Sequence, residues 1–295
     1  MDGLMRKVKN PAVENGIDYI GVAPVDRFKN APEGWKPGDL LKGANSVISI
    51  GIRIGEGVRE ANKIAYGGLR HGIYIYERFG YTLLNEELDR ISNHIARVLE
   101  KKGHIATPIP ASSPSDAYAL RGVFSNRHAA VAAGLGEFGW NTLLVTPDNG
   151  PRVRLASVIT DAQLDPDPMY EEKRICNREQ CNICVSVCPM NAISKDRSVK
   201  VKIGDRTFEY ARIDKMRCRF GTAALSSKTL GRTNFEIPPN PSHEDYLKIL
   251  SKEDPWQKME KDGSMCGRCI INCPIPMRGS AERKTLLSSP LRLKP

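Results

Sequence analysis

Eight cysteines constrain what this chain can fold into more than any other feature. None precedes residue 176 of the 295 residues. The full set is Cys176, Cys181, Cys184, Cys188, Cys218, Cys266, Cys269 and Cys273. Disulfide frameworks are typical of small secreted proteins, whereas a chain of this length with 40% hydrophobic residues can bury a sizeable core without them. Crowded thiols in such a chain favour metal ligation.

Two cysteine runs share one spacing. The first reads Cys176-x4-Cys181-x2-Cys184-x3-Cys188-Pro189, and the second reads Cys266-x2-Cys269-x3-Cys273-Pro274. The common Cys-x2-Cys-x3-Cys-Pro core is the iron–sulfur run of bacterial ferredoxins, in which the cysteine before the proline ligates the other cluster. Two [4Fe–4S] clusters use eight thiolates, which is the whole inventory. We therefore expect one cluster on Cys176, Cys181, Cys184 and Cys273, and a second on Cys188, Cys218, Cys266 and Cys269.

Zinc ligation and inert burial are the alternatives for these cysteines. Zinc sites usually pair two Cys-x2-Cys knuckles or add histidines, and neither cysteine run contains a histidine. The spacing therefore favours clusters. Cys218 stands alone between the runs, so its assignment depends on the ligand count.

The residues before the cysteines predict a mixed α/β or α+β domain. Residues 46–52 and 155–160 are rich in β-branched side chains, which predicts two buried strands. Residues 81–101 place apolar side chains at helical spacing, and Gly103 follows as a stop.

A polar, stiff stretch suggests where this domain ends. Asp165-Pro166-Asp167-Pro168 predicts a boundary between a first domain over residues 1–165 and a cluster-binding domain over residues 166–280. The second domain has an insertion at about 190–260, in which alternating apolar and polar residues around Gly204-Asp205 predict a β-hairpin. Residues 281–295 form a basic tail.

Composition limits the location and the partners of the chain. The mean hydropathy is −0.38, and no apolar run approaches the roughly 18 residues that span a bilayer. No apolar stretch follows the charged first residues, so we expect no secretory leader and a cytoplasmic location. The 44 basic and 34 acidic residues give a net charge of +10. That charge permits an acidic partner such as RNA or an acidic electron carrier, although a solvated basic surface explains it equally well.

A glycine-rich segment lies ahead of the cysteines. Residues 134–139 have the Gly-x-Gly-x-x-Gly spacing of dinucleotide-binding loops. Such a loop directly follows a strand, whereas the preceding alanines at 129–133 favour a helix. The context therefore disfavours NAD binding. The glycines either let backbone approach a large flat ligand or shape a turn.

Residues 127–147, the stretch 150–161 and the two cysteine runs together resemble the superfamily of epoxyqueuosine reductases and reductive dehalogenases. The resemblance covers roughly residues 40–275. It implies a nitroreductase-like core followed by a ferredoxin-like domain, with a base-off corrinoid (cobalamin) beside one of two [4Fe–4S] clusters. The corrinoid contacts that it implies are His128, Gly134, Leu135, Gly136, Gly139 and Asn141. Capping of the alanine-rich helix is the alternative role for His128.

The chain departs from both branches of that superfamily. Epoxyqueuosine reductases have an aspartate just upstream of the Gly-Leu-Gly segment, where this chain reads Leu120-Arg121-Gly122-Val123-Phe124. We expect neither their helical-repeat tail nor the twin-arginine leader of respiratory dehalogenases. Because the dehalogenases use a tyrosine proton donor with a basic neighbour, the candidate catalytic residues are Tyr118, Tyr81 and Arg121. Asp116 is a further acid near this place, and ordinary packing is the alternative for each tyrosine.

The resemblance implies an oxidoreductase, a cobalamin-dependent iron–sulfur reductase. Two clusters would pass electrons to a corrinoid that reduces a small-molecule or tRNA-borne substrate, and an external reductant such as ferredoxin or flavodoxin would supply them. One alternative is an epoxyqueuosine reductase acting on tRNA, favoured by the net charge and disfavoured by the missing aspartate. The other is a non-catalytic, ferredoxin-like electron-transfer protein.

Overall fold

The computed structural model describes residues 14–112, 120–223, 225, 228, 235–252 and 265–275. The strands are β1 (Tyr19–Pro24), β2 (Ser46–Arg53), β3 (Ala106–Ile109), β4 (Glu137–Phe138), β5 (Leu144–Val145), β6 (Val153–Thr160), β7 (Ile193–Ile203) and β8 (Arg206–Ile213). The helices are α2 (Pro37–Leu40), α3 (Glu56–Tyr66), α4 (Gly72–Glu77), α5 (Leu83–Glu100), α6 (Asn126–Ala132), α7 (Ile183–Ser186), α8 (Lys215–Thr222), α9 (His243–Ser251) and α11 (Arg268–Ile271). Two shorter turns are the 3₁₀ turn η1 (Val25–Phe28) and the π-turn η2 (Arg78–Thr82).

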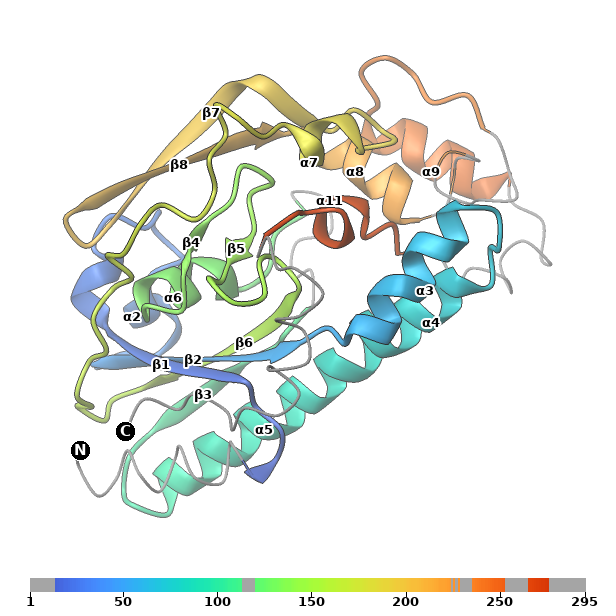
Figure 1. The fold of residues 1–295 in the computed structure, drawn as a ribbon. Coiled ribbons are helices and arrows are strands. Elements are labelled where there is room, and N and C mark those ends of the chain that lie inside the picture. The colour runs from blue at the N-terminus through green and yellow to red at the C-terminus, as the bar shows by residue number, and fades with distance from the viewer. Residues whose placement is uncertain are drawn as a thin grey trace.

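A four-stranded sheet of order β1-β2-β6-β3 lies at the centre of the first part of the chain (Figure 1). Every neighbouring pair is antiparallel. β2 and β6 coincide with the two strands predicted from the sequence, and they pair along their whole lengths from Ser46↔Thr160 to Arg53↔Val153. Because the sheet is antiparallel, the fold is α+β rather than a parallel α/β arrangement.

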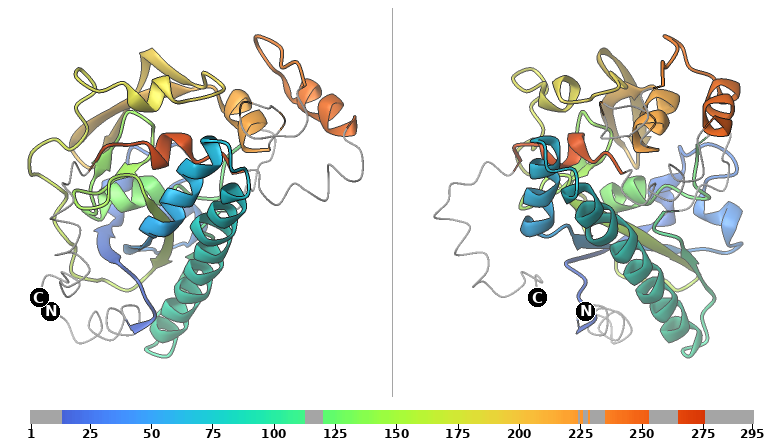
Figure 2. Two further views of the ribbon diagram at one scale, coloured as in Figure 1. Left: turned by 45° about the vertical axis from the view of Figure 1, so that its right-hand side comes forward. Right: turned by 90° about the vertical axis from the view of Figure 1, so that its right-hand side faces the viewer.

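Helix α5 covers one face of the sheet, as Figure 2 shows from two sides. Its apolar stripe of Leu88, Ile91, Ile95 and Leu99 is buried against alternate residues of the strands, among them Ile48. This is the helix predicted over residues 81–101. The structure divides that range, since the π-turn η2 occupies its first two residues before the regular helix begins at Leu83.

Helix α6 lies on the opposite face and approaches the sheet closely. Its alanines are buried, and a Cβ atom at Gly21 of β1 would lie 2.4 Å from the Ala133 carbonyl oxygen. Small side chains on both elements permit this approach. The helix predicted from the alanine run is thus confirmed, and its small side chains suit its close packing against the sheet.

The predicted hairpin is confirmed and packs over the first domain. β7 and β8 pair across Gly204-Asp205, and Ile203 and Tyr210 share a core with α6 and the sheet. The Gly204 amide also donates to the Arg27 carbonyl at 2.8 Å. Part of the predicted insertion therefore belongs to the same packed unit as residues before the predicted boundary, and the division at residue 165 stays a prediction.

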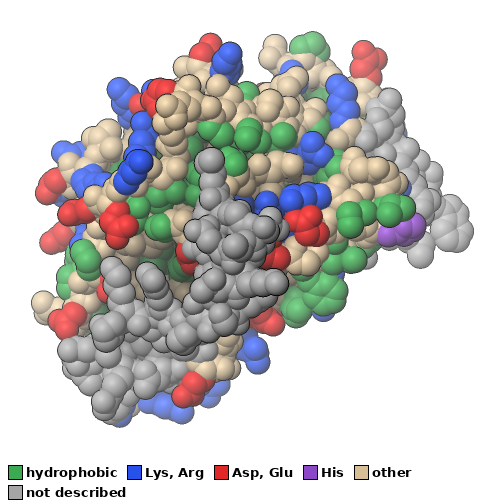
Figure 3. Space-filling view, viewed as in Figure 1, with side chains coloured by type: hydrophobic (Ala, Val, Ile, Leu, Met, Phe, Trp, Pro, Cys, Tyr) green, Lys and Arg blue, Asp and Glu red, His purple; other side chains and the backbone are tan. Residues whose placement is uncertain are grey.

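The cysteine-bearing elements lie along one side of this unit (Figure 1). The short helix α11 contacts both α7 and α3, and a separate apolar cluster of Met190, Phe220, Leu225 and Ile249 underlies α8 and α9. On the face seen in Figure 3, Lys and Arg side chains are interspersed with Asp and Glu rather than gathered in one patch. Within the described residues, no helix combines the length and apolar character needed to cross a membrane.

Candidate functional site

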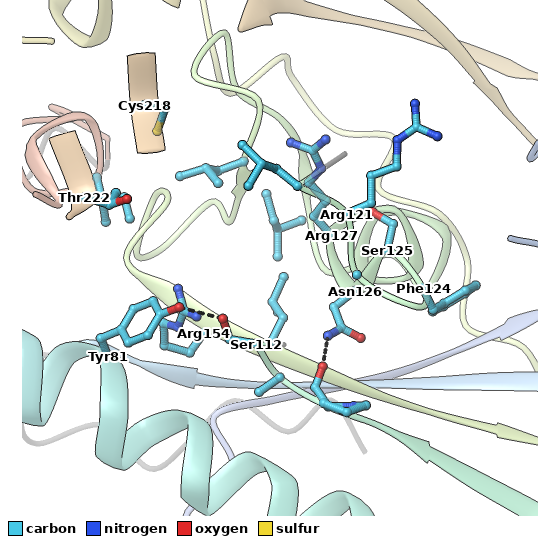
Figure 4. Close-up of a pocket in the computed structure, with 18 of the residues that line it drawn as sticks. Tyr81, Ser112, Arg121, Phe124, Ser125, Asn126, Arg127, Arg154, Cys218 and Thr222 are labelled. Carbon is cyan, nitrogen blue, oxygen red and sulfur yellow. Dashed lines mark hydrogen bonds between the residues drawn. The ribbon is translucent and has the colours of Figure 1, made fainter. Parts of the chain in front are cut away.

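A cavity of about 480 Å³ lies beside the cysteine region (Figure 4). Its walls come from η2, the segment after β3, the residues 120–127 that lead into α6, and strands β5 and β6. Helix α8 contributes Cys218 and α11 contributes Ile270. The volume is that of sites for cofactors and small molecules, and one cysteine faces it directly.

Tyr81 and Arg154 lie side by side at one end of the cavity (Figure 4). The Arg154 guanidinium carbon is 4.3 Å from the centroid of the Tyr81 ring. Its Nε donates to Asn85 Oδ1 at 2.9 Å, which fixes the guanidinium plane. The Tyr81 hydroxyl is 2.6 Å from Ser112 Oγ. The cavity thus presents a phenol next to a fixed cation.

All charged side chains in the described lining are cationic. They are Arg121, Arg127, Arg154, Lys215 and Arg219. Arg121, Lys215 and Arg219 are exposed, and Arg127 and Arg154 are half-buried. The positive field of such a lining would attract an anionic ligand.

The eight thiols fall into two sets by their electrostatic neighbours. Cys184 interacts with Cys176, Cys181 and Cys273, and Cys273 interacts with Cys176 and Cys181. We call these four the outer set. Cys218 interacts with Cys188 and Cys266, and Cys269 interacts with all three of them. We call these four the inner set, because its Cys218 faces the cavity.

Burial raises the pKa of one thiol in each set, Cys184 and Cys218, to about 12, and neighbouring thiols add to the shift. The inner and outer sets are joined by an interaction between Cys269 and Cys184. No group of His, Cys, Asp or Glu side chains in the described residues surrounds a single-ion position. A cubane, by contrast, spreads its four thiolates over separate irons.

The first cysteine loop is held by the glycine-rich segment. One carboxylate oxygen of Glu137 accepts hydrogen bonds from the amides of Ile175 (2.6 Å) and Cys176 (2.9 Å). The Trp140 amide donates to Cys176 Sγ at 3.3 Å. Residues just after the Gly-Leu-Gly sequence therefore hold the beginning of the first cysteine loop, at Cys176, in place.

The end of the second cysteine loop is held by buried polar side chains of the first domain. Arg152, only 2% exposed, donates to the Cys273 carbonyl at 2.9 Å and also to the Ile275 carbonyl. Asn141 Nδ2 donates to the Cys269 carbonyl at 3.2 Å. These contacts between protein groups dock the second cysteine loop against the core of the first domain.

Two tyrosines of the α3–α4 region enclose the start of the same loop. Gly267 has φ +62°, and a Cβ there would lie 2.4 Å from the Tyr76 ring. The Tyr66 hydroxyl donates to the Cys266 carbonyl at 3.2 Å, and Arg268 lies over the Tyr66 ring. The residue between Cys266 and Arg268 must therefore be glycine, for both its dihedral angle and its space.

Curated relatives of two kinds match this chain, although no family model does. An epoxyqueuosine reductase of Bacillus anthracis is 28% identical over 199 residues, which are 60% of this chain and 49% of that protein. A tetrachloroethene reductive dehalogenase of Desulfitobacterium hafniense is 45% identical over 75 residues, which are 24% of this chain and 13% of that protein. Over these stretches the chain is similar in sequence to epoxyqueuosine reductases and to reductive dehalogenases.

A solved structure agrees at the level of the fold. A reductive dehalogenase, described with a mechanism for B12-dependent dehalogenation, superposes with a TM-score of 0.51 at 19% identity. The match covers 90% of this chain and 36% of that chain. The chain spans about half the length of the epoxyqueuosine reductase from Bacillus anthracis.

The structure places only some of the predicted catalytic residues at the cavity. Tyr81 and Arg121 both line the cavity, and Arg121 also lies over the Trp35 ring at 5.2 Å. Tyr118 and Asp116 lie outside the described residues, so the pairing of Tyr118 with Arg121 stays a prediction. The cation beside Tyr81 is Arg154, which the sequence analysis did not identify.

The glycines expected to contact a corrinoid have close contacts within the protein. Gly134 has φ +79°, and a Cβ there would lie 2.0 Å from the Pro168 carbonyl oxygen. At Gly136 a Cβ would lie 2.2 Å from the Val145 carbonyl, and at Gly139 it would lie 2.5 Å from the Val145 side chain. None of these glycines, nor Leu135, belongs to the described lining of the cavity. Close backbone packing therefore accounts for the glycines, and their contact with a corrinoid stays a prediction.

His128 and Asn141 also have protein partners. His128 Nδ1 is 2.5 Å from Ser125 Oγ at the start of α6, and its Nε2 is 3.3 Å from the Tyr210 hydroxyl. Burial and the neighbouring Arg127 lower the pKa of His128 to about 3. His128 thus contacts side chains of Ser125 and Tyr210, whereas no side-chain hydrogen bond caps the start of α6. Its contact with a corrinoid stays a prediction.

Three charged residues of the site, one buried and two half-buried, were missed from the sequence. Glu137, Arg152 and Arg154 act on partners far away in the chain, and nothing in their local sequence marks them. Arg154 directly precedes the strand predicted over residues 155–160, and the structure includes it in β6.

Proposed function

We propose that this protein is an oxidoreductase whose two thiol sets each bind a [4Fe–4S] cluster and whose cavity binds a corrinoid. The observation that supports it most is the division of eight cysteines into two sets of four, one of which reaches the cavity through Cys218. Each set contains the cysteine before proline from the other run, as cross-ligated ferredoxin clusters require.

The lining of the cavity offers donors that suit a corrinoid. Its lining combines apolar side chains with Asn, Ser and Thr groups and with guanidinium donors, which match the amides and the phosphate of such a group. A bound corrinoid would supply low-potential two-electron chemistry, with the clusters as one-electron stores. The inner set, next to the cavity, would be the immediate donor, and the outer set would receive electrons from an external reductant.

The side chains of the cavity would then supply a proton and orient the substrate. The Tyr81 hydroxyl can donate a proton into the cavity, and the Arg154 guanidinium lies over its ring, where it can orient an anionic substrate. Ser112 holds the hydroxyl in place and can pass a proton to it from solvent. Tyr81 thus replaces Tyr118 as the first acid to test.

Anaerobic reconstitution with iron, sulfide and cobalamin tests this function. We expect about one corrinoid per chain to remain bound through gel filtration, with absorbance bands of both clusters and corrinoid. Protein that assembles both clusters but retains no corrinoid would support the electron-transfer alternative and overturn the cavity assignment.

Epoxyqueuosine reduction on tRNA is the second candidate, and the comparisons favour it over a small-molecule substrate. The longer curated matches are to epoxyqueuosine reductases, and the cationic lining suits a phosphate-bearing substrate. Reconstituted protein should reduce an epoxyqueuosine-modified tRNA stem-loop, with an affinity that falls as salt rises. Binding that is insensitive to salt, together with no reduction of the epoxide, would favour a small-molecule substrate.

A further inference from the structure

Arg127 is a half-buried cation whose described partners are a threonine and an aromatic ring. Its guanidinium donates to the Thr142 carbonyl at 2.7 Å and to Thr142 Oγ1 at 2.9 Å, and it lies 5.4 Å from the centroid of the Tyr210 ring. None of the ion pairs within the described residues involves Arg127. Burying a cation without a counter-ion opposes folding, so the arrangement points to a constraint at Thr142.

Thr142 is held in a conformation that its side chain disfavours. Its φ is +71°, in the left-handed region, and it is 4% exposed. A β-branched residue at positive φ is an outlier, because the Cβ substituents crowd the backbone. Such strain persists only where the surroundings enforce it, and it gathers at functional sites. Arg127 donates to both the carbonyl and the hydroxyl of this residue.

The turn that contains Thr142 touches one loop of each thiol set. It spans residues 139–142 and closes with the Thr142 amide donating to the Gly139 carbonyl at 2.9 Å. Within it, the Trp140 amide donates to Cys176 Sγ of the outer set, and the Asn141 side chain donates to the Cys269 carbonyl of the inner set. Arg127 itself lines the cavity (Figure 4). One side chain therefore links the cavity wall to both cysteine loops.

We propose that Arg127 is a positioning residue that locks Thr142 in the strained 139–142 turn and so sets both cysteine loops relative to the cavity. The predicted effect on the clusters rests on the proposed function, whereas the effect on the turn does not. Arg127 acts through the turn and makes no direct contact with a thiol among the described contacts.

Hydrogen–deuterium exchange on the full chain tests the effect on the turn. In Arg127→Gln we expect the amides of residues 139–143 to exchange ~10-fold faster or more, as loss of charge-assisted hydrogen bonds implies. Arg127→Lys should lie between Arg127→Gln and the wild type. The matched control is Lys215→Gln, which removes a cation from the same lining, where Nζ donates to the Leu120 carbonyl. It should leave exchange in the turn unchanged.

Rescue by glycine separates positioning from general packing. Glycine adopts positive φ without strain, so Thr142→Gly introduced into Arg127→Gln should restore slow exchange in the turn. In the cluster-loaded protein, Arg127→Gln should shift the midpoint potentials of both clusters, and the double variant should return them toward the wild-type values. Unchanged exchange and potentials in Arg127→Gln would overturn the proposal, as would an Arg127→Gln defect that Thr142→Gly does not relieve. A wild-type protein without iron would contradict the proposed function instead, and the exchange measurement would still decide the role of Arg127.

Discussion

Tyr81 and Arg154 provide the most direct test at the scale of single residues. Tyr81→Phe removes the hydroxyl that contacts Ser112 but keeps the ring under the Arg154 guanidinium. We expect both clusters and the corrinoid to remain bound and turnover to fall by ~100-fold, the usual scale for a lost general acid. Single-turnover kinetics with the reduced protein would measure it.

The control for this variant is Tyr170→Phe. Tyr170 is part-exposed and donates to the Lys173 carbonyl, away from the cavity. Equal turnover in Tyr81→Phe and Tyr170→Phe would show that the proton comes from another group.

His128 makes the stability of the fold depend on pH. Its pKa is lowered to about 3 in the fold, against about 6.5 for an unperturbed histidine. The stabilisation by neutral His128 is complete above pH 6.5 and is lost as the pH falls toward 3, because the unfolded chain binds the proton first. Between pH 7.5 and 5 we expect the free energy of unfolding to fall by about 2 kcal/mol from this group.

Chemical denaturation at a series of pH values measures this dependence. His128→Gln keeps a polar side chain of similar size and cannot titrate, so its stability curve should be flatter than that of the wild type over this range. Parallel curves for the two proteins would mean that another group causes the pH dependence.

At the scale of elements, the junction after α6 depends on glycine. Gly134 has φ +79° and no room for a Cβ against the Pro168 carbonyl. We expect Gly134→Ala to lower the free energy of unfolding by about 2–4 kcal/mol, from strain and from displacement of the 165–169 segment. Gly57→Ala is the matched control, because nothing lies within 4 Å of its Cβ position in α3. It should change stability by less than about 1 kcal/mol.

The outcome at Gly134 also separates two roles for this segment. A direct corrinoid contact predicts that the variant loses the corrinoid while its unfolding midpoint stays at the wild-type value. A packing role predicts instead that the free energy of unfolding of the variant falls even without a corrinoid.

Local patterns in the sequence predicted the elements that depend on neighbouring residues. β2, β6, α5, α6 and the β7–β8 hairpin follow from periodicity and turn residues within short windows. The spacing of the cysteine runs likewise indicates cluster ligands, because a cubane takes three thiolates from one short loop. The lone Cys218 could be placed only by the ligand count, and it lies beside Cys188 and Cys266 in the fold.

Contacts between distant parts of the chain could not be predicted in the same way. Arg152 and Cys273 are 121 residues apart in sequence, and their hydrogen bond depends on how the second loop docks on the sheet. The glycines at 134–139 show a second limit of prediction from the sequence. Glycine spacing indicates a close approach but does not say whether backbone or a ligand makes it, and here the near atoms are protein carbonyls and a valine side chain.

At the scale of the whole molecule, one sheet with its covering helices carries both the cavity and the supports for both cysteine loops. Glu137, Asn141 and Arg152 come from the region around β4 to β6, and each fixes a loop that brings thiols together. Cys269 and Cys184 join the two thiol sets, and Cys218 of the inner set lines the cavity.

The iron and sulfide content of anaerobically purified protein tests the central claim most directly. The account predicts about eight irons and eight sulfides per chain in the wild type, as two cubanes require. It also predicts about four of each in Cys218→Ala, because the outer set keeps its four thiols. About four irons in the wild type, stoichiometric zinc, or an unchanged iron count in Cys218→Ala would contradict it.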